Sequence, residues 1–258
     1  MLKGLYTAYS GMVNEQNRMD VLTNNLANAA TTGYKKEGST SRSFKDELAF
    51  KIKDNSEAPN IARRIGTMNM GVKIGENYTD YSQGSFRITD NACDMAISGQ
   101  GFFAIQFTNK AGDTSTKYTR DGSFTLNNDG YLVTKDGDYV LGTDENPIQI
   151  DPMQDFTVEQ DGTIWQGGAP VAEIQVTDFE DYNYLEHYGE NYYQPVEGAE
   201  EQPADAKVYS GYLEASNVQV VSEMVQMISV TRAYETNQKI IQTYDSSLDI
   251  AVNQLGKL

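Results

Sequence analysis

The sequence predicts an α+β protein: long N- and C-terminal helices pack as a coiled-coil-like domain, and a central, mostly antiparallel β-domain lies between them in the chain. Three observations predict this class. Apolar residues recur in alternating steps of three and four over both ends of the chain. The middle carries short runs of aromatic and β-branched residues. Asp-Gly dipeptides, which favour turns, separate these runs.

The N-terminal pattern predicts a helix over residues 3 to about 29. Its positions follow a near-heptad seam with one polar interruption, and Gly33 lies just beyond its end. The seam consists of Leu5, Tyr9, Met12, Gln16, Met19, Leu22 and Leu26.

The C-terminal pattern predicts a longer helix. No Pro or Gly occurs from Asn217 to Leu255, and a helix of that length spans about 55–60 Å at 1.5 Å per residue. Such a length favours coiled-coil packing. Ser216 followed by Gln219 predicts a capping box. The seam consists of Val220, Glu223, Met227, Val230, Tyr234, Asn237, Ile241, Tyr244, Leu248, Ala251 and Leu255. A second apolar row runs beside it at Val221, Val225 and Ile228.

The middle of the chain predicts a meandering sheet, a sandwich or a small barrel. Asp-Gly favours the two-residue type I′ hairpin turn, in which both central residues have positive φ. The dipeptides start at Asp121, Asp129, Asp136 and Asp161. Short strands are expected at 123–126, 131–134, 139–142 and 156–159.

These patterns predict four segments. Residues 1–35 form an N-terminal helical segment and residues 207–258 a C-terminal one, with the β-domain at 75–206. Residues 36–74 have little periodicity and are interpreted as an extended arm or linker. Residues 180–206, rich in tyrosines among carboxylates, form a second loose stretch.

The composition excludes several functions. The formal net charge is −17, which disfavours nucleic acid and anionic lipid as partners. The single cysteine, Cys93, allows no intramolecular disulfide and is interpreted as a small core residue. No apolar run reaches the length of a membrane span. The N-terminus has no signal-peptide pattern, which by itself predicts a cytoplasmic protein.

Catalytic chemistry is not indicated. The one histidine, His187, lies in the acidic, tyrosine-rich stretch and is interpreted as a surface residue. One His and one Cys cannot furnish a typical zinc site. Close carboxylates such as Asp178, Glu180 and Asp181 are expected by chance among 37 acidic residues. We therefore expect no catalytic residues, no metal, no cofactor and no small-molecule substrate.

Several sequence blocks together resemble flagellar basal-body rod and hook proteins. At the N-terminal end these are Ser10-Gly11-Met12, Asn24-Asn25-Leu26-Ala27-Asn28 and Thr32-Gly33-Tyr34-Lys35. At the C-terminal end they are Leu213 to Val218, Met227-Ile228 and Arg232-Ala233-Tyr234-Glu235. In the middle they are Ser98 to Phe103 and Tyr118 to Phe124.

The resemblance implies a structural subunit that is exported by the flagellar type III apparatus through an uncleaved signal, which overturns the cytoplasmic expectation. It implies a homo-oligomeric helical assembly, together with other rod and hook proteins. The terminal helices would form the axial domain of a tube in the basal body, and the β-domain would face outward. Length and the 36–74 segment favour a rod protein over the longer hook protein. The distal rod is favoured, with the proximal rod or a hook-like paralogue as the alternative.

Self-assembly is expected to use the two seams and the asparagine block, whose amides can bridge subunits by hydrogen bonds. The seam could equally join the two helices of one chain, and the asparagines could simply terminate a helix. The residues are Leu5, Tyr9, Met12, Met19, Leu22, Asn24, Asn25, Leu26, Asn28, Met227, Val230, Tyr234, Ile241, Tyr244, Leu248 and Leu255.

Two functions of other classes stay open. A secreted binding or adhesin module would hold a ligand through tyrosines of the 180–206 stretch, with Tyr192 and Tyr193 as the residues to test. A hydrolase would need a pocket that joins two carboxylates, and the sequence does not select a pair.

Overall fold

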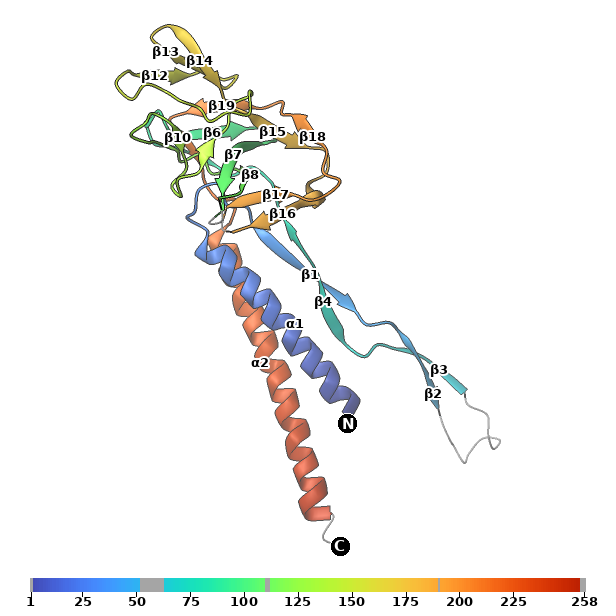
Figure 1. Ribbon diagram of the computed structural model, residues 1–258. Helices are drawn as coiled ribbons and strands as arrows, with labels where there is room; N and C mark the ends of the chain where they lie inside the picture. The colour runs from blue at the N-terminus through green and yellow to red at the C-terminus, as the bar shows by residue number, and fades with distance from the viewer. Residues whose placement is uncertain (1, 52–62, 110–111, 190, 256–258) are drawn as a thin grey trace. The chain divides into compact units, whose positions relative to one another are not determined.

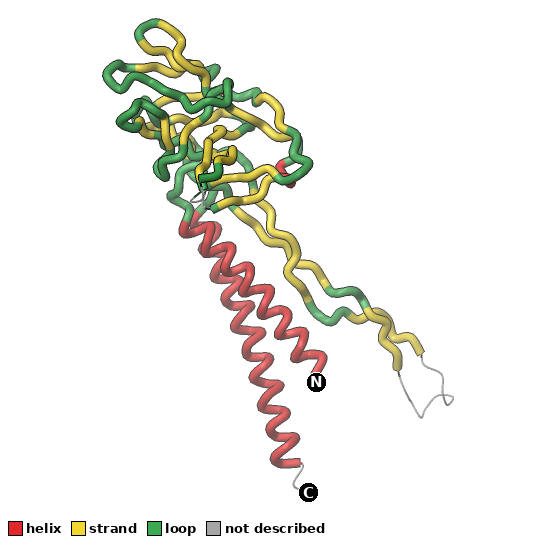
Figure 2. The backbone as a smooth tube through the Cα atoms, in the orientation of Figure 1, coloured by secondary structure: helices red, strands yellow, loops and turns green. Residues whose placement is uncertain are grey.

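The computed structural model describes residues 2–51, 63–109, 112–189 and 191–255 (Figures 1 and 2). The chain divides into two compact units. Unit 1 comprises Met1–Ala27, Glu37–Asp80 and Gln219–Leu258, and unit 2 comprises Asn28–Lys36 and Tyr81–Val218. The chain therefore begins and ends in unit 1.

Unit 1 contains two long antiparallel helices. Helix α1 spans Leu2–Ala27, and α2 spans Val220–Ile250 and continues as a π-helical turn, Ala251–Leu255. Both chain ends lie at the same end of the helix pair (Figure 1). The helices contact each other, and the β-rich region between them in sequence is antiparallel, so the predicted α+β class is confirmed.

The C-terminal seam agrees with the structure. Between Glu223 and Ala251 every predicted seam position is buried or half-buried, whereas most neighbouring positions on α2 are exposed. Val230 is 2% exposed. Among the seam positions whose burial the structure describes, Val220 at the first turn is the one exposed side chain, at 39%. An unbroken heptad pattern thus located the buried face of α2.

The N-terminal seam was partly wrong. Tyr9 is 55% exposed and Gln16 is also exposed, whereas Ala8 and Asn14 are buried. The face of α1 that meets α2 carries small residues, which allow the two helices to approach closely. A pattern of large apolar side chains therefore does not identify this face. The seam residues Leu5, Met12, Met19 and Leu26 are half-buried and Leu22 is buried.

The predicted capping box at the start of α2 is also wrong. The N-cap is Gln219, and its side chain makes no capping hydrogen bond. The Ser216 hydroxyl instead accepts a hydrogen bond from the Val218 amide at 3.2 Å, because the helix begins three residues later than that box requires.

The rest of unit 1 is a two-stranded antiparallel ribbon in two sections. Strand β1, Glu37–Ser43, pairs with β4, Val72–Thr79. Strand β2, Glu47–Lys51, pairs with β3, Arg63–Met68. The sequence predicted an extended arm over 36–74 but not the pairing of its strands, and β4 continues beyond that segment to Thr79. Residues 52–62 lie outside the described residues.

The regular secondary structure described in unit 2 consists of β-strands and one 3₁₀ turn. Its largest sheet has nine strands, in the order β16-β17-β8-β7-β11-β10-β9, with β15 joined to β7 and β18 to β15. The others are β12-β13-β14, β19-β6 and β20-β5. The bounds are β5 Phe86–Ile88, β6 Met95–Ser98, β7 Phe102–Thr108, β8 Thr114–Thr119, β9 Thr125–Leu126, β10 Leu132–Val133, β11 Tyr139–Val140, β12 Phe156–Val158, β13 Thr163–Gln166, β14 Ala169–Glu173, β15 Val176–Phe179, β16 Leu185–Tyr188, β17 Tyr192–Pro195, β18 Glu201–Pro203, β19 Lys207–Ser210 and β20 Tyr212–Glu214, with a 3₁₀ turn at Tyr182–Tyr184.

Two apolar clusters form the core of unit 2. One is aliphatic with two phenylalanines, and the other is mainly aromatic. The first contains Met95, Ile97, Phe103, Ile105, Phe124, Leu132, Val140, Ile148, Ile150, Ile164, Ile174 and Val208. The second contains Phe102, Ala104, Tyr118, Leu141, Phe179 and Tyr193. The tyrosine-rich stretch 180–206 therefore belongs to the main sheet and its core, and it is not loose.

The four middle strands were predicted in the right places, but the turns differ. Gly130, Gly137 and Gly162 have positive φ, whereas the aspartate before each does not. Each glycine amide donates to the carbonyl three residues earlier, at Asn127, Thr134 and Glu159. This is the longer hairpin loop that ends in a glycine bulge, and not the two-residue type I′ turn.

Among the described residues, no helix combines the length and the apolarity that a bilayer span requires.

Candidate functional site

The facing surfaces of α1 and α2 are matched at heptad intervals. A Cβ atom added at Gly4 would lie 2.3 Å from the Tyr244 hydroxyl, and one added at Gly11 would lie 3.0 Å from Asn237 Nδ2. Both pairs advance by seven residues, in opposite directions along the two helices. Glycine at these positions lets the larger α2 side chains pack directly against the α1 backbone.

Asn25 joins three elements of unit 1. Its side-chain amide donates to the Glu37 carbonyl oxygen at 2.7 Å, and its Oδ1 accepts from the Glu37 amide at 2.9 Å. The same amide lies 3.4 Å from Glu223 Oε2 on α2. Asn25 and Glu223 are both 0% exposed. The asparagine therefore ties the end of α1 to the first residue of β1 and to α2.

Several large apolar side chains of unit 1 are exposed to solvent. On α2, Val221 is 77% exposed, Val225 62% and Ile228 55%. With Met224 these form a stripe at helical spacing, away from the seam. We call Val221, Met224, Val225 and Ile228 the outer stripe of α2.

A groove also runs between α1 and the ribbon, with a volume of about 620 Å³. Apolar side chains line it from both sides, including Tyr6, Tyr9, Phe44, Val72 and Ile74. The Thr7 hydroxyl, which donates to the Met70 carbonyl oxygen at 3.1 Å, ties the two walls together. Unit 1 thus carries two exposed apolar surfaces on its helices and ribbon.

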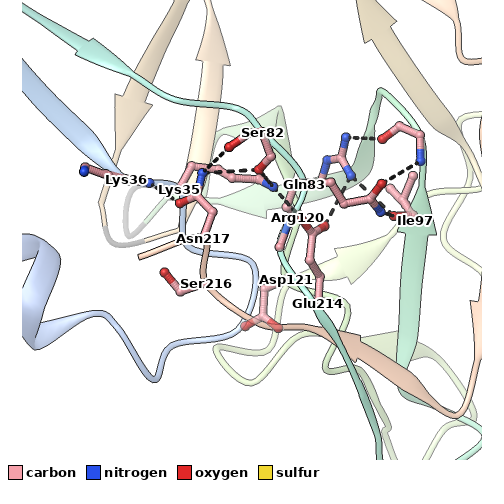
Figure 3. A network of polar contacts seen from close by, with 12 residues as sticks. Lys35, Lys36, Ser82, Gln83, Ile97, Arg120, Asp121, Glu214, Ser216 and Asn217 are labelled. Atoms are coloured by element: carbon pink, nitrogen blue, oxygen red, sulfur yellow. Dashed lines mark hydrogen bonds and ion pairs between the residues drawn. The ribbon is translucent and has the colours of Figure 1, made fainter. Parts of the chain in front are cut away.

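In unit 2 a buried carboxylate lies between two buried cations (Figure 3). Glu214 Oε1 is 2.5 Å from Lys35 Nζ, and Glu214 Oε2 is 3.2 Å from Arg120 Nη1. The three side chains are 1%, 1% and 4% exposed. Charged groups are tolerated at such depth when they are paired and their remaining hydrogen-bonding capacity is used.

Backbone groups use much of that capacity. Lys35 Nζ donates to the Ser82 carbonyl oxygen at 2.9 Å, and Arg120 Nη2 donates to the Gly99 carbonyl oxygen at 2.7 Å. The Gly84 amide donates to Glu214 Oε1 at 2.8 Å. We call Lys35, Arg120 and Glu214 the buried triad.

The triad brings together segments that are far apart in sequence. Residues 28–36 follow α1 in the chain, and residues 213–218 precede α2. The Gly33 amide donates to the Glu214 carbonyl oxygen at 2.9 Å, and the Lys36 amide donates to Asn217 Oδ1 at 2.8 Å. Thr32 donates to Asp121 at 2.6 Å, beside Arg120. Both connections to the terminal helices are thus fixed to the β-structure of unit 2.

Gly33 is required by its surroundings. Its φ is +70°, and an added Cβ atom would lie 2.4 Å from the Arg120 carbonyl carbon and from the Asp121 amide nitrogen. A side chain here would therefore meet backbone atoms, which cannot rotate away.

The predicted assembly residues occupy different environments. The α2 members and most α1 members lie on the less exposed faces of the helices, as reported above. Asn24 is exposed and Asn25 is buried. The Asn28 carbonyl oxygen accepts from the Thr31 amide at 3.1 Å, in a turn after the helix. The Leu255 side chain lies outside the described residues. The role of these residues in assembly stays a prediction.

The sequence reasoning missed the triad and the glycine contacts. Lys35, Arg120 and Glu214 all lie inside sequence blocks that carried the family resemblance, which was the available signal. Nothing in a single sequence pairs residues 35 and 214.

The tyrosine-rich stretch is largely engaged within unit 2. Tyr193 is 2% exposed, and the Tyr182 hydroxyl donates to Asp178 at 2.6 Å. The Tyr192 hydroxyl lies 3.2 Å from Asp138 Oδ2. Burial is the main cause that raises the pKa of Tyr192 and of Asp138. The binding-module hypothesis therefore loses Tyr193 as an exposed ligand contact.

Among the described residues, no three His, Cys, Asp or Glu side chains are grouped as a metal site would require. His187 is half-buried, with its ring centroid 5.4 Å from that of Tyr193.

Three family models match successive parts of the chain. Residues 5–35 match the flagella basal body rod protein model, residues 96–166 the flagellar hook protein FlgE/F/G D1 domain, and residues 209–255 the flagellar basal body rod FlgEFG protein C-terminal model. The matches include the two terminal helices and all members of the buried triad. They define a class of structural, non-enzymatic proteins.

Similar proteins match over nearly all of the chain. The flagellar hook-basal body complex protein FlhO of Bacillus subtilis (strain 168) is 36% identical, with 100% of both chains covered. The basal-body rod protein FlgF of Caulobacter vibrioides is 34% identical over 100% of both chains. The basal-body rod protein FlgG of Bacillus subtilis is 35% identical over 98% of this chain and 99% of its own. The chain belongs to the flagellar basal-body rod FlgE/F/G family, and its role in the basal-body rod is structural.

Proposed function

We propose that this chain is a self-assembling subunit of the flagellar rod, and that copies join one another and neighbouring rod and hook subunits through unit 1. The outer stripe of α2 carries the proposal. A stripe of this kind on a soluble helix requires a partner surface, because each large aliphatic side chain contributes about 1.5–3 kcal/mol on full burial.

The predicted seam takes a supporting role in this mechanism. The seam residues Asn237 and Tyr244 lie against Gly11 and Gly4 of α1 in the same chain, which supports a seam that holds the helix pair together. The outer stripe and the groove beside α1 then remain for contacts between copies. Export by the flagellar type III apparatus, with the terminal segments unfolded, would precede this folding at the growing tip.

A charge on the outer stripe tests the proposal. The full-length double variant Val225→Glu/Ile228→Glu should fold normally and should not assemble, since a carboxylate cannot be buried in an apolar interface. The matched control is Gln238→Glu/Gln242→Glu, which adds two charges at exposed positions of the same helix. Motility and isolated basal bodies give the readout. Normal rods built from the stripe variant would refute the proposal.

The distal segment of the rod is the location that we favour within the assembly. The chain length and the 36–74 segment support a rod protein over the longer hook protein, and FlgG relatives match nearly the whole chain. FlhO and FlgF relatives match equally well, so the proximal rod is the alternative.

Cells that lack the chain should retain a shortened rod if the subunit is distal. Loss of the whole rod would instead support the proximal assignment.

A further inference from the structure

The charge of the chain is divided very unequally between the two units. Unit 1 contains 12 Lys and Arg residues against 13 Asp and Glu residues, a formal charge of −1. Unit 2 contains 8 Lys and Arg against 24 Asp and Glu, a formal charge of −16. Nearly all of the net charge of −17 therefore belongs to unit 2.

The acidic excess of unit 2 lies on its surface. Three of its cations, Lys35, Lys117 and Arg120, are each 4% exposed or less. Among the described residues of unit 2, 18 acidic residues are exposed against three basic ones. The exposed basic residues are Arg87, Lys135 and Lys207. Three carboxylates, Asp138, Asp178 and Glu214, are buried as well, so burial leaves the acidic excess of unit 2 at its surface.

Exposed apolar side chains show the opposite distribution. Of the 22 large hydrophobic residues that are exposed among the described residues, 15 lie in unit 1. They include the outer stripe of α2 and the walls of the groove beside α1. The nearly neutral unit therefore carries most of the surface that favours association, and the acidic unit carries most of the surface that opposes it.

We propose that unit 2 acts as an electrostatic spacer between copies of this chain. Its negative surface prevents association through unit 2, directs copies to meet through unit 1, and makes assembly depend on ionic strength. The proposal rests on the self-assembly proposed above. Like-charged surfaces repel over about one Debye length, which is about 10 Å at 0.1 M salt and about 3 Å at 1 M. Salt should therefore allow copies to approach.

Two matched sets of substitutions in the full-length chain test the location of the charge. The unit 2 set replaces four exposed glutamates: Glu159→Gln, Glu173→Gln, Glu197→Gln and Glu200→Gln. The unit 1 set replaces four exposed acids: Asp20→Asn, Glu47→Gln, Glu235→Gln and Asp245→Asn. Both sets change the net charge from −17 to −13, so only the position of the change differs.

Self-association of each protein is followed by light scattering and sedimentation velocity between 0.02 and about 1 M NaCl, a range that spans Debye lengths of roughly 20 Å to 3 Å. The unit 2 set should associate at about half the salt concentration that the original chain requires, or less, because repulsion between exposed charges is screened by salt. The unit 1 set should stay within about 20% of the original midpoint, since unit 1 is nearly neutral. Salt also strengthens apolar association, but it does so for both sets alike.

Three outcomes would overturn the spacer. They are an equal shift of the salt midpoint in the two sets, no shift of the midpoint in either set, and association that weakens as salt is added. Failure of the proposed function gives a different result. In that case no protein self-associates at any salt concentration, or Val225→Glu/Ile228→Glu has no effect in the unit 2 set. If the stripe substitution abolishes association while the two charge sets behave alike, self-assembly through unit 1 is supported and the spacer is refuted.

Discussion

Lys35 and Glu214, 179 positions apart in the chain, form an ion pair of 2.5 Å in which both side chains are 1% exposed. Arg120 completes the triad on the second carboxylate oxygen. The pair joins the segment that follows α1 to the segment that precedes α2.

Replacing Glu214 by Gln should strongly destabilise unit 2. The substitution leaves two buried cations facing a neutral amide, and removal of one partner of a buried ion pair typically costs about 3–5 kcal/mol. Denaturant unfolding followed by circular dichroism measures the loss. The control, Glu200→Gln, changes an exposed carboxylate and should cost less than about 0.5 kcal/mol.

In a Lys35→Met background, Glu214→Gln should cost less than it does alone, because the two residues share one interaction. Additive losses would contradict the pairing.

Replacing Gly33 by Ala should destabilise more than the same change at another glycine of positive φ. Gly137 has φ +94° and no atom within 4 Å of an added Cβ, so Gly137→Ala measures backbone strain alone. At Gly33 the strain is joined by overlap with the backbone of Arg120 and Asp121. We expect about 1 kcal/mol at position 137 and at least about twice that at position 33, compared by thermal unfolding. Equal losses would show that the contact at Gly33 relaxes easily.

Replacing Asn25 by Ala should loosen the start of β1. The substitution removes the two hydrogen bonds to the Glu37 backbone and leaves buried groups unsatisfied, which costs about 1–3 kcal/mol. Hydrogen exchange at the Glu37 amide should accelerate by the corresponding factor. Asn77→Ala, at an exposed position of β4, serves as the control. Unchanged protection at Glu37 would exclude the proposed junction.

Replacing Asp138 by Asn should stabilise the protein at neutral pH. Burial raises the pKa of Asp138, so the folded state holds this proton more firmly than the unfolded chain does. Its contribution is favourable below the unfolded pKa and is lost as the pH rises through the folded one. Asparagine stays neutral throughout. The midpoint of thermal unfolding should therefore increase at pH 7, and this advantage should shrink toward pH 3.

The exposed control for that measurement is Asp129→Asn. It should leave the unfolding midpoint nearly unchanged, since substitutions at exposed positions usually have small effects on stability. A gain at Asp138 that persists unchanged at pH 3 would point to a cause other than ionisation.

The helices and strands followed largely from local patterns. The heptad steps of residues 223 to 251 identified the face of α2 that contacts its neighbour, because only one face of a helix can be buried in a pair. Short strands between the Asp-Gly dipeptides were also placed correctly, because turn residues and runs of β-branched and aromatic residues are local signals. The segment 36–74 was predicted as an extended arm, but its paired strands were not predicted, because their described side chains are mostly exposed and no alternation marks them.

The sequence by itself determined the class, the two terminal helices, the β-rich middle and the family, since these depend on periodicity and on contiguous blocks. Tertiary structure alone decided which residues meet. It placed Gly4 and Gly11 against α2, turned Asn25 toward Glu37, and buried Lys35, Arg120 and Glu214 together. Such contacts join distant positions, and their energy depends on burial and pairing. Neither property can be read from the order of residues along one chain.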